Sequence, residues 1–245
     1  MAPIIHCVRH AQGYHNISEE NHKILDPNLT PFGQEQCLSL AKSFPYHNTV
    51  DLVVASALSR TIDTALAGFG DDIKRGGYKV IALPDLQEAS ELPCDTGSSP
   101  DVLAKKYADK PVDLGLVKED WTSKKGRYSP DVEAVKARAR DARKWLMARP
   151  EKEIVVVTHG GFLHYLTEDF VGSNTPNHTG WTNTEYRTYV FSNNDTDNAH
   201  MIETPKSRSR RFPEEQASLD REELAQLPPV HTSGVDVSAT VKVQA

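Results

Sequence analysis

The chain has 245 residues, of which 38% are hydrophobic and 25% are charged, and its formal net charge is −6. This composition is typical of a soluble globular protein with one large or two small domains. The net negative charge argues against nucleic acid as a partner, since nucleic-acid binding leaves a basic footprint, so any anion site must be basic only locally.

Cysteine spacing and hydropathy indicate the compartment. The three cysteines, Cys7, Cys37 and Cys94, form no C-x-x-C pair, so the sequence indicates neither a zinc site nor a disulfide framework. No segment has the length of a membrane span or the pattern of a signal peptide. We therefore expect a cytoplasmic protein, with the nucleus as a further compartment, and no membrane partner.

Strands and helices are predicted to alternate along most of the chain. In order, they are a strand over residues 4–8, a helix over 31–44, a strand over 51–55, a helix over 56–68, a strand over 78–83, a helix over 131–148, a strand over 153–158, a helix over 162–171, and a hairpin of strands over 187–192 and 199–202. Thr30 is the expected N-cap of the first helix, with Pro31 at its first position.

Two regions have weaker patterns. Residues 84–128 are rich in Pro, Gly and Ser, with helical potential only near 101–107, and long loops of this kind are often functional lids. From residue 204 onward no packing pattern is left. We predict one domain over residues 1–205, with an insert or lid at about 89–129. The C-terminal tail over 206–245 is predicted to be flexible or draped on the surface.

The helix over residues 131–148 has an apolar stripe and several basic residues. The stripe consists of Val132, Val135, Ala139, Ala142 and Leu146. The basic residues are Arg138, Arg140, Arg143 and Lys144, which lie largely off this stripe. We interpret them as a solvated face rather than a ligand site.

Alternating strands and helices, with strongly apolar strands, predict an α/β fold with three α/β/α layers and a largely parallel central sheet. Ligands of such sheets bind at the carboxyl ends of the strands. Polar residues follow the predicted strands at Arg9, His10, Arg60, Glu88 and His159. The sequence therefore predicts that these five side chains share one rim of the sheet.

The spacing of residues excludes several well-known catalytic motifs. A cysteine-dependent phosphatase needs C-x5-R, but the sixth positions after the cysteines hold Gly13, Ser43 and Pro100. The chain has no G-x-x-x-x-G-K-[ST] loop and no H-E-x-x-H motif. Asp195 and Asp197 lie in an Asn-rich hairpin loop, where turn formation explains them better than a metal site does.

Five segments of the chain form one ordered set of motifs. They are Arg9-His10-Ala11 with Asn16, Leu29-Thr30-Pro31-Phe32-Gly33-Gln34-Glu35-Gln36, Ser56-Ala57-Leu58-Ser59-Arg60 with Thr64-Ala65, Leu86-Gln87-Glu88, and Thr158-His159-Gly160-Gly161. Together they resemble the histidine phosphatase superfamily, in its phosphoglycerate-mutase-like branch. The matches come in the family's order and span residues 4 to about 170, which is far more specific than any single motif.

The resemblance implies a role for each matching residue. His10 is the expected nucleophile, which forms a phosphohistidine, and Glu88 the expected proton donor, which later activates water. The expected phosphate-binding residues are Arg9, Asn16, Arg60 and His159. No metal and no cofactor are implied, because the cationic cluster takes the place of a metal ion.

The resemblance also separates hydrolysis from transfer. The family's mutases resemble R-H-G-E-S-x-W-N, but Gln12-Gly13 stands here in place of the Glu-Ser pair. Residues 92–98 and 179–187 resemble fungal members described as broad-range phosphatases. We therefore expect a phosphomonoester hydrolase acting on a small phosphorylated metabolite.

Two alternatives stay open: a phosphoglycerate-type phosphomutase, and a non-catalytic phosphate-binding module. Retention of both His10 and Glu88 favours an enzyme over the latter. In the lid, Trp121 and Tyr128 are either substrate-facing or packed aromatic residues, and we favour packing. The sequence identifies neither the physiological substrate nor the oligomeric state.

Overall fold

The structure is a computed structural model that describes residues 2–170, 180–192 and 195–211. The chain divides into two compact units, residues 1–207 and 208–245, and the sheet and the candidate site belong to the first. The predicted tail lies outside the described residues from residue 212 onward. Residues Pro205–Arg211 form a last helix, which was not predicted from the sequence.

A single sheet forms the centre of the first unit. The described strands are β1 (Ile4–Arg9), β2 (Leu52–Ala55), β3 (Val80–Ala82), β4 (Val112–Asp113), β5 (Glu153–Thr158), β6 (Tyr186–Phe191) and β7 (Met201–Glu203). Their order is β4-β3-β2-β5-β1-β6-β7. Strands β1 to β5 are mutually parallel, while β6 runs antiparallel to both β1 and β7.

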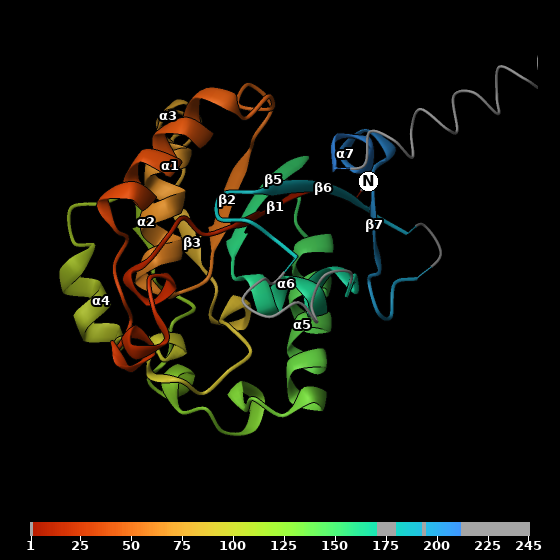
Figure 1. The fold of residues 1–245 in the computed structure, drawn as a ribbon. Coiled ribbons are helices and arrows are strands. Elements are labelled where there is room, and N and C mark those ends of the chain that lie inside the picture. The colour runs from red at the N-terminus through yellow and green to blue at the C-terminus, as the bar shows by residue number, and fades with distance from the viewer. Residues whose placement is uncertain (1, 171–179, 193–194, 212–245) are drawn as a thin grey trace, which may run out of the picture. The chain divides into compact units, whose positions relative to one another are not determined.

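Helices cover both faces of the sheet (Figure 1). The described α-helices are α1 (Pro31–Ser43), α2 (Ser59–Gly68), α3 (Gly70–Gly76), α4 (Pro100–Lys106), α5 (Val132–Met147), α6 (Gly160–Thr167) and α7 (Pro205–Arg211). Helices α1, α2 and α3 lie on one side of the strands, and α5 and α6 lie on the other (Figure 1). This confirms the three-layer α/β/α fold with a largely parallel sheet.

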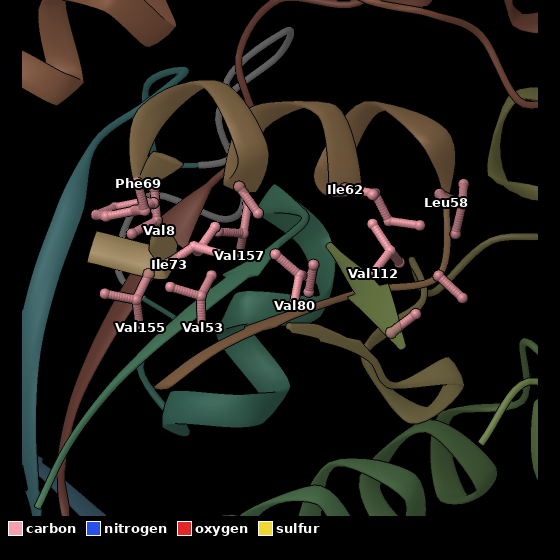
Figure 2. Packing of buried hydrophobic residues seen from close by; sticks show 14 of the residues in the cluster. Val8, Val53, Leu58, Ile62, Phe69, Ile73, Val80, Val112, Val155 and Val157 are labelled. Atoms are coloured by element: carbon pink, nitrogen blue, oxygen red, sulfur yellow. The ribbon is translucent and has the colours of Figure 1, made fainter. Parts of the chain in front are cut away.

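Each central strand contributes alternate side chains to two separate hydrophobic cores, as the period of a strand requires. On β5, Val155 and Val157 face the core under α2 and α3, whereas Ile154 and Val156 face the core under α5 and α6. Figure 2 shows the first core, where Phe69 and Ile62 pack over the valines of the sheet. Burial on both faces explains why these strands are continuous apolar runs.

Most predicted elements are present at nearly the predicted bounds. The Thr30 hydroxyl accepts a hydrogen bond from the backbone N–H of Gly33 at 2.9 Å, so Thr30 is the N-cap of α1. The Asp195 carboxylate accepts the backbone N–H groups of Asp197 and Asn198, which confirms the turn interpretation of this loop. Helix α3 and strand β4 were not predicted.

The interpretation of the basic residues of α5 as a solvated face was wrong for two of them. Arg138 and Arg143 are buried, at 1% and 3% exposure. Arg138 donates hydrogen bonds to the carbonyl oxygens of Asp85 and Gln87, and its guanidinium stacks on Phe162. Position 138 is three residues after Val135, and therefore on the buried stripe itself. Buried carbonyl groups are what make arginine tolerable there.

None of the helices in the described ranges is long and apolar enough to cross a membrane.

Candidate active site

The register of β1 against β5 brings two histidines together. Arg9 is paired with Thr158, so the residues that follow, His10 and His159, leave neighbouring strand ends side by side. The backbone N–H of His10 continues the ladder by donating to the Thr158 carbonyl at 2.9 Å. The two imidazole ring centres are 5.2 Å apart, and both rings are buried.

Helix α2 places Arg60 beside these histidines. Strand β2 pairs with β5 up to Val157, and α2 starts four residues after the end of β2. The N-cap position of α2 is Leu58, which has no polar side chain, and the carboxylate of Asp26 takes over this task from another segment. It accepts the backbone N–H and the hydroxyl of Ser59, both at 2.8 Å. The negative charge of Asp26 also complements the N-terminal dipole of α2.

Arg60 is the hub of the site. Its Nε donates to His10 Nε2 at 3.3 Å, and one Nη2 hydrogen is directed to His159 Nδ1 at 3.0 Å. Its second Nη2 hydrogen donates to the Asp95 carboxylate at 2.8 Å, and Nη1 donates to the Cys94 carbonyl at 2.6 Å. The guanidinium is 1% exposed. A buried cation held at four points is fixed in position and is suited to bind an anion.

Hydrogen bonds define the tautomer of His10. Its Nδ1 lies 2.7 Å from the Ala11 carbonyl oxygen, which can only accept, so Nδ1 carries the proton and Nε2 the lone pair. Burial, together with the charges of Arg60 and Arg9, holds the pKa of His10 well below its ordinary value. The ring is therefore neutral at neutral pH, with its nucleophilic nitrogen directed toward Arg60.

His159 is neutral for the same physical reasons. Its Nδ1 accepts from Arg60, so the opposite nitrogen, Nε2, donates to the Ser56 hydroxyl oxygen at 2.9 Å. Burial and the charge of Arg60 hold the pKa of His159 well below its ordinary value. An arriving phosphate would offset this charge and favour protonation of Nδ1.

Glu88 follows β3 and a short 3-10 helix and lies against the start of α6. Its carboxylate accepts the backbone N–H of Gly161 at 3.0 Å and that of Ala89 at 2.7 Å. Glycine at position 161 leaves room for this carboxylate, because a Cβ there would lie 2.7 Å from Glu88 Oε1 and would displace it. Burial raises the pKa of Glu88, and the charge of Asp95 raises it further. A carboxyl with a raised pKa is suited to donate a proton.

The remaining two predicted site residues are Arg9 and Asn16, and they have different contacts. Arg9 donates to the Trp181 carbonyl, while its Nε is buried with no hydrogen-bond partner among the described residues. Its charge acts on both Glu88 and Arg60. The Asn16 side-chain oxygen accepts the backbone N–H of Gly13 at 3.0 Å, which leaves its amide N–H groups for another acceptor.

Several residues near the site were not identified from sequence. Ser56 orients His159, Asp95 anchors Arg60, and His15 packs 5.3 Å from His10 between ring centres. Lys124 donates to the Gln87 side chain at 2.9 Å, and burial lowers its pKa to about 8. Ser56 and His15 lie inside the quoted motifs, but nothing in the sequence distinguishes them from neighbouring polar residues. Asp95 and Lys124 approach only through the fold of the segment after β3.

The sequence left open whether Trp121 and Tyr128 face the substrate or pack, and the structure shows that Trp121 packs. It is fully buried and donates from its indole N–H to the Ser98 carbonyl at 3.1 Å. Gly97 lies directly against its ring. Trp121 is thus a packed core residue of the segment that follows β3.

Within the described ranges, no group of three or more His, Cys, Asp or Glu side chains is arranged to hold a metal ion. The groups that are present can hold an anion and supply a neutral imidazole nitrogen and a carboxyl with a raised pKa. A largely parallel sheet that is covered by helices on both faces, with this site at its carboxyl edge, is the arrangement in which α/β proteins bind their ligands.

Comparison with known proteins identifies the family. The model of the histidine phosphatase superfamily (branch 1) matches residues 5–204. The chain belongs to this superfamily and is an enzyme of it, as the motifs indicated.

Sequence relatives agree with this assignment. A phosphoglycerate mutase-like protein from Arabidopsis thaliana is 32% identical over 205 residues, which cover 68% of this chain and 74% of that protein. A probable phosphatase from Schizosaccharomyces pombe is 29% identical over 160 residues, 64% of this chain and 73% of that protein.

Solved structures confirm the fold. A phosphoserine phosphatase from Entamoeba histolytica, solved as a mutant with phosphoserine, superimposes with a TM-score of 0.51 at 20% identity, covering 82% of this chain and 95% of that one. YhfR from Bacillus stearothermophilus superimposes with a TM-score of 0.50 at 18% identity, covering 83% and 96%.

Proposed function

We propose that this protein is a metal-independent phosphomonoester hydrolase that acts on a small phosphorylated metabolite through a phosphohistidine on His10. The observation that carries the proposal is the direction of the His10 lone pair. The hydrogen bond from Nδ1 to Ala11 leaves Nε2 unprotonated and facing Arg60, beside His159. A nucleophile placed among anion-binding groups is what attack on a phosphate requires.

In the first step, His10 Nε2 attacks phosphorus as the bond from phosphorus to the leaving oxygen breaks. The leaving oxygen takes the proton of Glu88, whose raised pKa keeps that proton available. Arg9, Arg60, Asn16 and a protonated His159 would hold the non-bridging oxygens, on which negative charge remains throughout the transfer. The substrate phosphate would take over the N–H groups that Arg60 now directs to the two histidines.

In the second step, Glu88 as a carboxylate takes a proton from a water molecule. The water oxygen attacks phosphorus, the bond to His10 Nε2 breaks, and inorganic phosphate leaves. Both steps use the same fixed cations, so the charge neutralisation that a metal ion provides in other phosphatases is supplied here by guanidinium and imidazolium groups. This is the basis for proposing independence from metals.

Hydrolysis is preferred over the mutase alternative because of the surroundings of Gln12, which replaces the glutamate of the mutase motif. Its backbone N–H donates to the Gln36 side chain at 2.8 Å, and its side-chain oxygen accepts the Thr30 hydroxyl at 2.8 Å. Gln12 is therefore engaged with α1. The relative named a probable phosphatase agrees with hydrolysis, while the relatives named phosphoglycerate mutase-like are the reason to test transfer as well.

The domain boundaries are part of the proposal. We assign the catalytic domain to residues 1–205 and a lid to about 89–129. Two lid residues support this assignment because they contact the site: Asp95 binds Arg60, and Lys124 binds the residue before Glu88. Substrate selection would then depend on side chains of this segment.

Hydrolysis of an aryl phosphate and an alkyl phosphate in excess chelator tests the proposal, with wild type, His10→Ala, Glu88→Gln and the control Glu91→Gln. We expect His10→Ala to abolish turnover of both. Glu88→Gln should reduce kcat/KM, which reports the first step, by about 10² to 10⁴-fold for the alkyl phosphate, and by less for the aryl phosphate, whose leaving group needs no proton. Glu91→Gln should resemble wild type.

Undiminished turnover by His10→Ala would refute the nucleophile, and loss of wild-type turnover in chelator would refute metal independence. Phosphate exchange in a 2,3-bisphosphoglycerate-dependent mutase assay that is faster than hydrolysis would establish the mutase alternative instead.

A further inference from the structure

His15 is a buried histidine in the candidate site for which the proposed mechanism has no role. It belongs to the short 3-10 helix Tyr14–Asn16 that follows β1. Its side chain is 7% exposed, and its ring centre lies 5.3 Å from that of His10. The residue next to it, Asn16, was predicted from sequence as the neutral donor to phosphate.

The two ring nitrogens of His15 have different surroundings. The edge with Nδ1 and Cε1 packs on Gly13, where a Cβ would lie 2.7 Å from Nδ1. Nδ1 is buried and has no hydrogen-bond partner among the described residues. Nε2 also forms no hydrogen bond to a described residue, but it is not sealed from solvent.

This difference defines the tautomer. An enclosed lone pair without a partner is tolerated more often than an enclosed N–H group without one, so the proton belongs on Nε2. Gly13 closes off the other nitrogen. Nε2–H is therefore the group that can reach a ligand.

The charges around His15 keep it neutral. Burial and the nearby Arg60 and Arg9, with His22 as a smaller contribution, lower the pKa of His15 to about 2. A neutral, buried imidazole beside two arginines has no hydrogen-bond acceptor for its N–H group, because arginine side chains only donate. An anion held by the same two arginines would give its N–H an acceptor.

We infer that His15 is a further substrate-binding residue, whose Nε2–H donates a hydrogen bond to a non-bridging oxygen of the phosphate that reacts with His10. This inference rests on the proposed function, because it places the phosphate between His10 and the arginines. Within this 3-10 helix, it assigns to His15 a phosphate contact that the resemblance gave only to the neighbouring Asn16.

Binding of inorganic phosphate measured by titration calorimetry tests the inference, in wild type, His15→Phe, His15→Gln and the control His22→Phe. Phenylalanine keeps the ring and removes the donor, and we expect phosphate binding about tenfold weaker or more. Glutamine carries an amide N–H at nearly the position of Nε2 and should recover most of the affinity. His22→Phe makes the same change in the next 3-10 helix and should bind phosphate as wild type does.

A purely structural role would give equal losses for phenylalanine and glutamine, and that result would overturn the inference. So would wild-type phosphate affinity in His15→Phe. A thermal melt of each variant shows whether it is folded. Aryl phosphate turnover by the wild type is measured in parallel: absence of turnover refutes the proposed function, whereas normal turnover with unchanged phosphate binding in His15→Phe refutes only the role of His15.

Discussion

Arg60 donates hydrogen bonds to the lone pairs of both site histidines while Asp95 and a carbonyl hold its other N–H groups. Asp95 thus has two effects on the same site. It positions the cation that would hold phosphate, and its charge is one cause of the raised pKa of Glu88. A carboxylate outside the predicted site therefore contributes to both charge stabilisation and proton transfer.

The pH profile of Asp95→Asn follows from these two effects. Protonated Glu88 is the reactive form in the first step, so kcat/KM for an alkyl phosphate should fall as pH rises through the pKa of Glu88. Removing the charge of Asp95 lowers this pKa, and we expect the basic limb of the profile to move to lower pH. A limb that stays in place or moves to higher pH would contradict this role.

Asp141→Asn is the matched control for this pH profile. Asp141 is a half-buried carboxylate on α5 that pairs with Arg127, and its removal should leave the profile unchanged.

Among the elements, α1 packs closely against the segment that follows β1 and carries His10. Its Gly33 packs on the backbone of Gln12, two residues after His10, and a Cβ at position 33 would lie 2.1 Å from the Gln12 carbonyl oxygen. The Thr30 hydroxyl also donates to this residue, at its carbonyl and side-chain oxygens. The glycine of the quoted motif is therefore required by a contact between two elements, and not by a turn.

Gly33→Ala should separate α1 from this segment. We expect the free energy of unfolding to fall by about 1 to 3 kcal/mol, with a loss of aryl phosphate turnover, because the segment also carries His10. Urea denaturation and a turnover assay measure the two effects.

Gly70→Ala is the control for Gly33→Ala, since no atom lies within 4 Å of a Cβ at position 70. It should be neutral or stabilising by up to about 1 kcal/mol, as alanine is favoured in helices. Equal behaviour of the two variants would contradict the importance of this close approach.

Across the whole molecule, the predictions from sequence succeeded where the local pattern and the tertiary structure agree. Buried parallel strands such as β5 contain a continuous apolar run, and capped helices such as α1 are marked by Thr30 and Pro31, so both were predicted closely. The rim of five polar residues followed from the rule for parallel sheets.

The failures concern residues whose role depends on distant partners. Arg138 is basic by sequence but buried, because carbonyl groups from the segment before Glu88 surround it. Asp95 and Lys124 come to the site through the fold of a long irregular segment, which no periodicity describes. His15 is distinguished only by the environment of its ring nitrogens.

The proposed mechanism requires that Nε2 of His10 carries the phosphoryl group between the two steps. Rapid quenching of the enzyme during turnover of an alkyl phosphate, followed by proteolysis and mass spectrometry under alkaline conditions that preserve phosphohistidine, measures this directly. We expect a phosphoryl group on the peptide that contains His10, attached at Nε2, which accumulates further in Glu88→Gln when an aryl phosphate is used. Turnover without any phosphoryl-enzyme in wild type and Glu88→Gln, or with the phosphoryl group on another residue, would contradict it.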